Sequence, residues 1–121
     1  MTISEAAERF GMTHDTLRYY ERIGLIPPVP RDKSGRRDYD EESCNWISLM
    51  KCLRSAGVQI EALVEYVRLC RASGDTVEAR RAILIDQREK LKARIDEMQE
   101  SLALLDKKIS FYDVKSIVID K

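Results

Sequence analysis

Apolar positions recur at helical spacing near the start of the chain, where they predict two short helices. The first covers residues 3–10, with Ser4 as a plausible N-cap, and ends at Gly11, because glycine adopts the left-handed conformation of a helix end without strain. The second begins after Thr13 and runs for roughly ten residues. Two short helices joined by a tight turn that contains glycine are typical of a helix-turn-helix.

The next segment cannot be helical, because prolines at positions 27, 28 and 30 lack the backbone donor and restrict the residues before them. A turn signal at Lys33-Ser34-Gly35 follows, between short extended flanks. We therefore predict a small hairpin, or wing, over residues 31–39. It holds the densest group of basic side chains in the chain: Arg31, Lys33, Arg36 and Arg37.

Two further helices are predicted over about 41–56 and 59–73. Asp40 caps the first, whereas Gln59 is a weak cap for the second. The expected inward residues are Trp46, Leu49, Met50, Leu53 and Ala56 in the first helix and Leu63, Tyr66, Val67 and Cys70 in the second.

From Asp75 to about Asp113 the chain has neither glycine nor proline, which predicts one long helix opened by a capping box of Asp75 and Glu78. At 1.5 Å per residue, ~38 residues would span roughly 57 Å. Such a helix cannot bury its apolar stripe against the small preceding domain, so a second copy of the chain is expected to cover it, with a fold-back onto the same chain as the alternative. The a positions of the heptad are Val77, Leu84, Leu91, Met98, Leu105 and Tyr112, and the apolar d positions are Ile95, Leu102 and Ile109.

Composition narrows the possible functions. The 121 residues contain 21 basic and 21 acidic side chains, so contact with nucleic acid must come from a local basic cluster. A single histidine leaves little acid–base chemistry, and no set of catalytic residues is apparent, so an enzyme is not expected. Three cysteines without C-x-x-C pairing, no long apolar run and no basic leader favour a cytoplasmic protein without a membrane segment.

The second predicted helix mixes basic and aromatic side chains in the run Thr16-Leu17-Arg18-Tyr19-Tyr20-Glu21-Arg22. This could be a solvated helix with two chance arginines, or a helix that lies in the major groove of DNA and presents arginine to guanine or phosphate. The predicted wing favours the second interpretation, because a nearby basic element can grip the flanking backbone.

That run, continued by Ile23-Gly24-Leu25-Ile26 and then by Gly35-Arg36-Arg37-Asp38-Tyr39, resembles the MerR family of bacterial transcription regulators. The resemblance covers about residues 2–113. It implies a mainly α fold, with a winged helix-turn-helix and helical hairpin over 1–74, a dimerisation helix over 75–113 in an antiparallel coiled coil, and a short tail over 114–121. It also implies a homodimer on double-stranded promoter DNA, which bends and untwists that DNA for RNA polymerase.

The resemblance assigns Arg18 and Tyr19 to the recognition helix and Arg37 and Tyr39 to the wing. Further expected DNA-binding residues are His14, Thr16, Arg22, Arg31 and Arg36, the last two on charge alone. Dimerisation is assigned to Leu84, Leu91, Ile95, Met98, Leu102, Leu105 and Ile109.

The cysteines do not suggest a metal site, because soft metals need two or more converging thiolates or imidazoles, and no cofactor is expected. Cys52 lies in the third predicted helix, at a position similar to that of the cysteine in a branch of the family that responds to aldehydes and nitrosative stress. It could be a stress sensor or a small buried hydrophobe, and Cys44 and Cys70 are expected to pack. The alternatives are a regulator with a ligand pocket at the dimer junction, an architectural DNA-binding protein and a coiled-coil adaptor.

Overall fold

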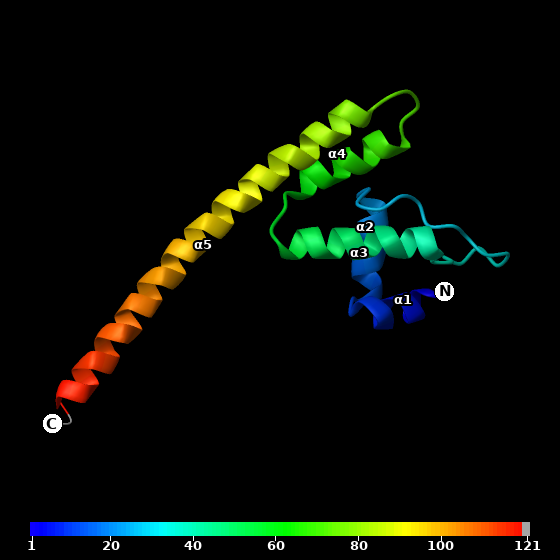
Figure 1. The fold of residues 1–121 in the computed structure, drawn as a ribbon. Helices are drawn as coiled ribbons and strands as arrows, with labels where there is room; N and C mark the ends of the chain where they lie inside the picture. The colour runs from blue at the N-terminus through cyan, green and yellow to red at the C-terminus, as the bar shows by residue number, and fades with distance from the viewer. Residues whose placement is uncertain (120–121) are drawn as a thin grey trace. The chain divides into compact units, whose positions relative to one another are not determined.

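A computed structural model describes the backbone of residues 1–119 and the side chains through Val114. The predicted mainly α fold is confirmed: over this range the chain forms five helices and no extended strand. It divides into two compact units, Met1–Gln87, called the head below, and a second unit that begins at Arg88. The helices are α1 (Ile3–Phe10), α2 (His14–Arg22), α3 (Glu41–Ser55), α4 (Ile60–Arg71) and α5 (Val77–Ile119) (Figure 1).

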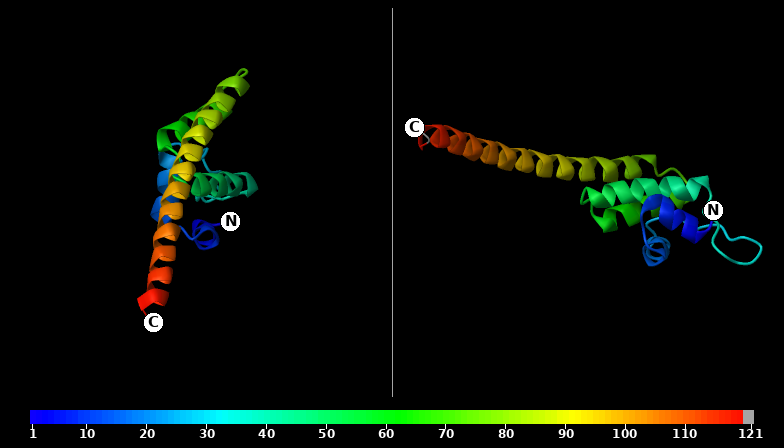
Figure 2. Two further views of the ribbon diagram at one scale, coloured as in Figure 1. Left: turned by 60° about the vertical axis from the view of Figure 1, so that its left-hand side comes forward. Right: turned by 90° about the horizontal axis from the view of Figure 1, so that it is seen from below.

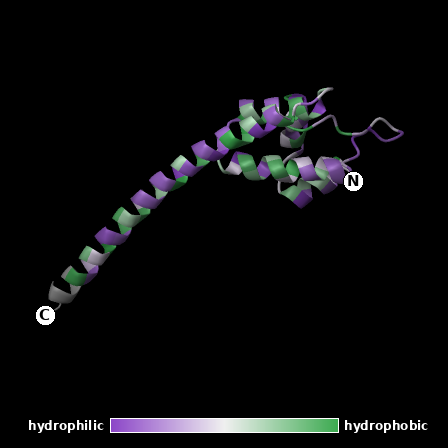
Figure 3. Ribbon diagram, turned by 45° about the horizontal axis from the view of Figure 1, so that its top comes forward, coloured by the Kyte–Doolittle hydropathy of each residue, from purple (hydrophilic) through white to green (hydrophobic). Residues whose placement is uncertain are grey.

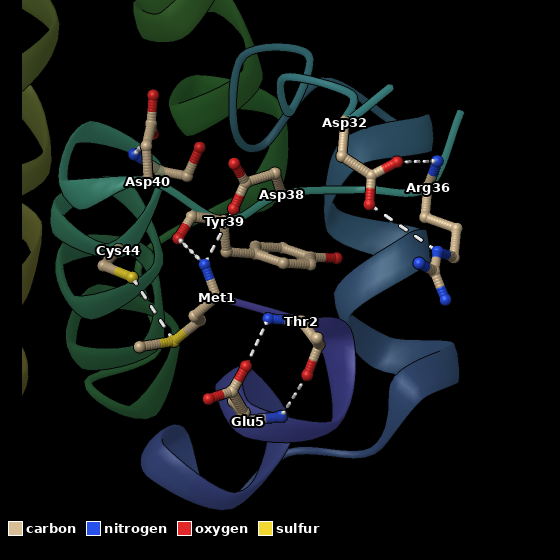
Figure 4. Close-up of polar contacts among 10 residues, drawn as sticks. Met1, Thr2, Glu5, Asp32, Arg36, Asp38, Tyr39, Asp40 and Cys44 are labelled. Carbon is tan, nitrogen blue, oxygen red and sulfur yellow. Dashed lines mark hydrogen bonds and ion pairs between the residues drawn. The ribbon is translucent and has the colours of Figure 1, made fainter. Parts of the chain in front are cut away.

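The start of α1 differs from the prediction, because Thr2 rather than Ser4 is its N-cap. The Thr2 hydroxyl accepts from the Glu5 amide at 3.2 Å, and Glu5 Oε1 accepts from the Thr2 amide at 2.8 Å (Figure 4). This reciprocal capping box satisfies two helix-end donors, which a cap at Ser4 would have left free. The predicted caps Thr13 and Asp40 are confirmed.

The core of the head lies where α1 and α2 meet α3. Ala6, Leu17 and Ile47 are fully buried, and Leu25 and Ile26 seal the core from the loop after α2. The inward face of α3 was predicted in part: Met50 is buried and Trp46, Leu53 and Ala56 pack against the core as expected. Leu49, however, is 42% exposed, and Ile47, which was not predicted to face inward, is fully buried. Apolar residues occur on more than one side of this helix, so the periodicity did not determine which side would pack.

The wing is less regular than a hairpin. One isolated antiparallel bridge joins Arg31 and Arg37, and the Asp32 amide donates to the Arg36 carbonyl at 2.7 Å. The turn depends on Gly35, whose φ of +82° lies in the left-handed region. Figure 2 shows this loop projecting away from α1 and α3.

In α4, Leu63 and Val67 are buried as predicted, and Tyr66 packs edge-on against Trp46 at 6.3 Å. Gln59 makes no side-chain cap for α4. Its side chain instead accepts from Gln87 Nε2 at 3.1 Å, and its amide donates to Gln87 Oε1 at 3.3 Å. Both residues of this amide pair lie in the head, which includes residues 77–87 of α5.

The predicted capping box at the start of α5 is not formed. Asp75 accepts from the Val77 amide at 3.1 Å, and Val77 is already the first helical residue. At its other end α5 continues past Asp113 to Ile119, because no glycine or proline stops it. Of the expected tail over 114–121, only residues 120–121 lie outside the described residues.

Beyond Arg88, α5 carries apolar side chains that its own chain leaves largely in solvent. Met98 is 69% exposed, and hydrophobic and hydrophilic residues alternate along the helix in Figure 3. The exposed members of the predicted heptad seam here are Ile95, Met98, Leu102, Leu105, Ile109 and Tyr112. No helix in the described part of the chain is long and apolar enough to cross a bilayer.

Candidate DNA-binding surface

One face of α2 is anchored in the core and another is exposed. Leu17 and Tyr20 are buried, and this fixes the rotation of the helix. Arg18 and Tyr19 consequently lie on the surface. Arg18 pairs with Asp15 at 3.3 Å, and the Arg22 guanidinium lies over the Tyr19 ring, 5.3 Å from its centroid. The exposed face therefore presents basic and aromatic groups, which suit base edges and phosphates.

A pocket of about 490 Å³ separates this face from the wing. Four of the predicted DNA-binding arginines line it, although they come from two elements far apart in sequence: Arg18, Arg31, Arg36 and Arg37. Asp32 and Gly35 of the wing and Thr2, Ile3 and Ser4 at the start of α1 complete its wall, so one carboxylate lies among the four guanidinium groups. A concave surface with four guanidinium groups is suited to an anion such as a backbone phosphate.

Hydrogen bonds within the wing hold these arginines. Arg31 donates to the Gly35 carbonyl at 3.1 Å, and Asp32 accepts from the amides of Ser34 and Arg36 at 2.8 and 3.0 Å. These backbone donors, that of Arg36 first, lower the pKa of the Asp32 carboxyl below its usual value. The charged Asp32 also lies 3.6 Å from the Arg36 guanidinium, as Figure 4 shows, and so steadies an otherwise exposed side chain.

Arg37 is the least exposed of these arginines. Its Nε donates to Glu21 Oε1 at 2.6 Å, and Glu21 Oε2 accepts from the Val29 amide at 3.0 Å. The pair joins α2 to the wing and lies at the boundary of a second hollow, which Arg18, Arg22 and Pro28 also line.

The structure does not place Tyr39 on this surface, although it was expected there. Its side chain is 1% exposed and belongs to the core, and in Figure 4 its ring extends between Thr2 and Asp32. Burial raises the pKa of its hydroxyl, for which the described residues offer no hydrogen-bond partner. Tyr39, two residues after Arg37, therefore belongs to the core rather than to the exposed surface of the wing.

His14 and Thr16 lie at the start of α2, outside the two arginine-lined hollows. His14 Nε2 is 3.4 Å from the Ser4 hydroxyl, which links α1 to α2. Thr16 contributes its amide and hydroxyl to the cap at Thr13, at 3.0 and 2.9 Å. Both residues make contacts at the first turn of α2.

Sequence reasoning missed two contributors to this surface. The start of α1 was not expected there, although the spacing Thr2-x-x-Glu5 is a capping-box signal that would have located it. Glu21 was identified only as part of the run that resembles the MerR family, and no contact was predicted for it. Nothing local to Glu21 indicates that it meets Arg37, because that contact depends on how the wing folds back.

The cysteines occupy three environments. Cys44 is buried against the core, Cys70 is half-buried and Cys52 is exposed in the last turns of α3. Among the described residues no group of three or more histidine, cysteine or acidic side chains converges in a way that could hold a metal.

Comparisons with known proteins agree with this geometry. The family model for MerR HTH regulatory proteins matches residues 1–70. The chain is 57% identical over 91 residues to the transcriptional regulator AdhR of Bacillus subtilis, covering 75% of this chain. It spans 65% of the length of AdhR. It is also 33% identical over 111 residues to an HTH-type transcriptional regulator of Haemophilus influenzae, which covers 92% of this chain and 82% of that protein.

Two solved structures that are similar to this chain are also those of MerR family regulators. A MerR family regulator from Listeria monocytogenes is 50% identical and superposes with a TM-score of 0.91, over 93% of this chain and 86% of that one. HiNmlR, a MerR family regulator that lacks the sensor domain and was crystallised on promoter DNA, is 33% identical, with a TM-score of 0.82 over 93% and 89% of the two chains. These relatives are transcription regulators, not enzymes. The chain therefore belongs to the MerR family and is a DNA-binding transcriptional regulator.

Proposed function

We propose that this regulator reads its operator with the exposed face of α2 and grips the flanking backbone with the wing. The observation that carries the proposal is the pocket between them, which four arginines from α2 and the wing line together. In this arrangement Arg18 and Tyr19 reach base edges or nearby phosphates, and Arg31, Arg36 and Arg37 hold phosphate. HiNmlR, bound to promoter DNA, supports a role of this kind for the shared fold.

The proposal includes a homodimer formed through α5. Supporting it, seam residues such as Ile95, Met98 and Leu102 are exposed in the single chain, and burying them in a partner's seam would remove a long apolar stripe from water. Two heads held by one coiled coil would contact two half-sites, so the operator would be pseudo-palindromic. Distortion of the DNA between the half-sites would act on RNA polymerase through the promoter's shape rather than by contact.

Within this function we assign stress sensing to Cys52. Its thiol is exposed, whereas the Cys44 thiol is buried. An aldehyde would react by addition: the Cys52 sulfur bonds to the carbonyl carbon, and the thiol proton passes to the carbonyl oxygen to give a hemithioacetal. The Cys52 carbonyl accepts from the Ala56 amide at 3.1 Å, in the last turn before the α3–α4 loop. Gln59 in that loop pairs with Gln87 of α5. A structural change at Cys52 could therefore be transmitted through the α3–α4 loop and this pair to α5.

DNA contact is tested by Arg18→Ala and Arg37→Ala in a binding assay over a range of salt concentrations. If Arg18 reads a base, its loss costs about 1–3 kcal/mol and depends on the operator sequence. If Arg37 holds phosphate, binding to every DNA weakens and the salt slope falls by about one per contact. Lys107→Ala, on the distal part of α5, is the charge-matched control. Unchanged affinity for both head variants would refute this docking.

Sensing is tested by Cys52→Ser in a promoter–reporter strain exposed to formaldehyde or methylglyoxal. The variant should bind the operator normally yet give no induction, while Cys44→Ser and Cys70→Ser respond. A full response by Cys52→Ser, together with a small molecule bound at the dimer junction, would replace this proposal with the ligand-pocket alternative. Footprinting separates both from an architectural role, which predicts uniform coverage rather than one discrete site.

A further inference from the structure

Glu21 is an acidic residue placed among groups that should face DNA. Its side chain is 14% exposed, and that of its partner Arg37 is 24% exposed. The hollow that Glu21 lines is otherwise shared with Arg18, Arg22, Arg37 and Pro28. By charge alone a carboxylate there opposes the approach of phosphate. Its presence therefore needs a geometric reason.

The reason lies in its two oxygens, which bind two different parts of the wing region. Oε2 accepts from the Val29 amide, in the loop that leads into the wing, and Oε1 accepts from Arg37 Nε, on the return segment. Arg31 and Arg37 are themselves bridged, so the carboxylate ties the base of the wing to the last turn of α2. One side chain thus holds the recognition helix and the base of the wing at a set spacing.

We propose that Glu21 is a positioning residue for DNA recognition, which orients the Arg37 guanidinium toward the DNA backbone and fixes the wing relative to α2. This inference rests on the proposed phosphate contact of Arg37. The planar guanidinium cannot turn freely once its Nε–H bond is fixed. Among the described residues Arg37 has this one partner, and its terminal nitrogens remain as donors on the surface that lines both hollows.

The neighbours of the pair cannot replace this role. Tyr39 is buried, and its hydroxyl has no partner among the described residues, so it does not hold Arg37 by a hydrogen bond. Asp32 is engaged by the amides of Ser34 and Arg36 at the tip of the wing. Glu21 is accordingly the acceptor that sets the Arg37 geometry.

The test is Glu21→Gln, measured as operator affinity and non-specific affinity across salt concentrations. Glutamine keeps an acceptor for Val29 but removes the charge that holds Arg37. We expect affinity to fall about tenfold on the operator and on non-specific DNA alike, the scale of one charge-assisted hydrogen bond, because the phosphate contact proposed for Arg37 is independent of base sequence. A carboxylate that only repels DNA predicts the opposite sign, because its removal should tighten binding to every sequence.

Glu8→Gln on α1 is the matched control, since it makes the same change of side chain and charge at an exposed position of the head and leaves Glu21 and the Arg18–Asp15 pair in place. It should leave operator affinity unchanged or raise it. Arg37→Lys provides a second route if Glu21→Gln folds poorly by circular dichroism: it keeps the cation, loses the planar fork and should show the same tenfold loss. In an Arg37→Ala background, Glu21→Gln should add no further loss.

Operator binding by folded Glu21→Gln that equals or exceeds that of the parent chain would overturn the proposal. So would wild-type affinity of Arg37→Lys, or losses that simply add in the double variant. Each of these results leaves the DNA-binding role of α2 standing if Arg18→Ala still weakens binding, so the two proposals can fail separately.

Discussion

The head and the distal part of α5 use apolar residues in opposite ways. In the head, short helices and a proline-containing loop enclose a core in which Leu17, Leu25 and Ile47 are completely buried. Along α5 beyond Arg88, Met98, Leu102 and Leu105 are mostly exposed. The head can therefore be stable as a single chain, whereas the apolar face of the distal helix is buried only when a partner supplies the other half of its core.

This difference assigns separate tasks to the two regions. A closed core holds α2 and the wing in one geometry, as base recognition requires. If α5 forms the proposed dimer through this exposed apolar stripe, the stability of the distal helix depends on chain concentration, because its folding and association are coupled. Mutations in the two regions should accordingly produce different kinds of failure.

The largest expected effect is the loss of the dimer in Leu91→Asp/Met98→Asp. Each carboxylate placed in the seam would cost about 3 kcal/mol or more without a partner. Light scattering should report monomers, and circular dichroism should still show a folded head. Glu97→Asp is the control on the same helix. A dimer that survives the double change would mean that another surface pairs the chains.

The next largest effect is expected in the core of the head. Leu63→Ala removes a fully buried side chain from α4 and should lower the free energy of unfolding by about 2–5 kcal/mol. Chemical denaturation followed by the fluorescence of Trp46, the single tryptophan, would measure this loss of stability. Folded Leu63→Ala should keep the oligomeric state of the parent chain. Monomers of a fully folded variant would show that the core of the head and the α5 seam do not act independently.

A smaller effect is expected where the head meets α5. Gln59→Ala leaves the buried Gln87 amide with fewer partners and should cost about 1 kcal/mol. Gln59→Glu keeps an acceptor for Gln87 Nε2 and should retain part of this stability. If the pair couples Cys52 to α5, Gln59→Ala should also reduce induction by aldehyde in the reporter strain. Thermal melts and the reporter together separate the two roles.

The smallest effect is a dependence of the head's stability on acid. Backbone donors lower the pKa of Asp40, chiefly the Ser43 amide, and of Glu5, chiefly the Thr2 amide. Their contribution is fully present above their ordinary values of 3.8 and 4.5 and is lost as the pH falls through the lower folded values. The melting temperature should therefore be level near neutrality and decline below about pH 4. Asp40→Asn keeps a cap that cannot titrate and should flatten part of this decline, and an unchanged acid profile would argue against the cap's contribution.

The sequence by itself determined the local elements and the family. Caps such as Thr13 and Asp40, the glycines that end helices and the heptads of α5 act over a few residues, so spacing alone located four of the five helices to within about two residues. The motif of the second helix and the basic residues of the wing could likewise be identified from the sequence alone. Even so, the end of α5 was placed too early, since nothing in the sequence after Asp113 breaks a helix.

Only the tertiary structure decided which side of each element faces inward and which distant residues meet. It turned α3 so that Ile47 rather than Leu49 is buried, and it placed Tyr39 in the core instead of on the surface of the wing. It also brought Arg37 onto Glu21, sixteen positions away. These outcomes depend on the shapes of several elements packed together at once, because a buried position is defined by its neighbours in space rather than by its neighbours in sequence.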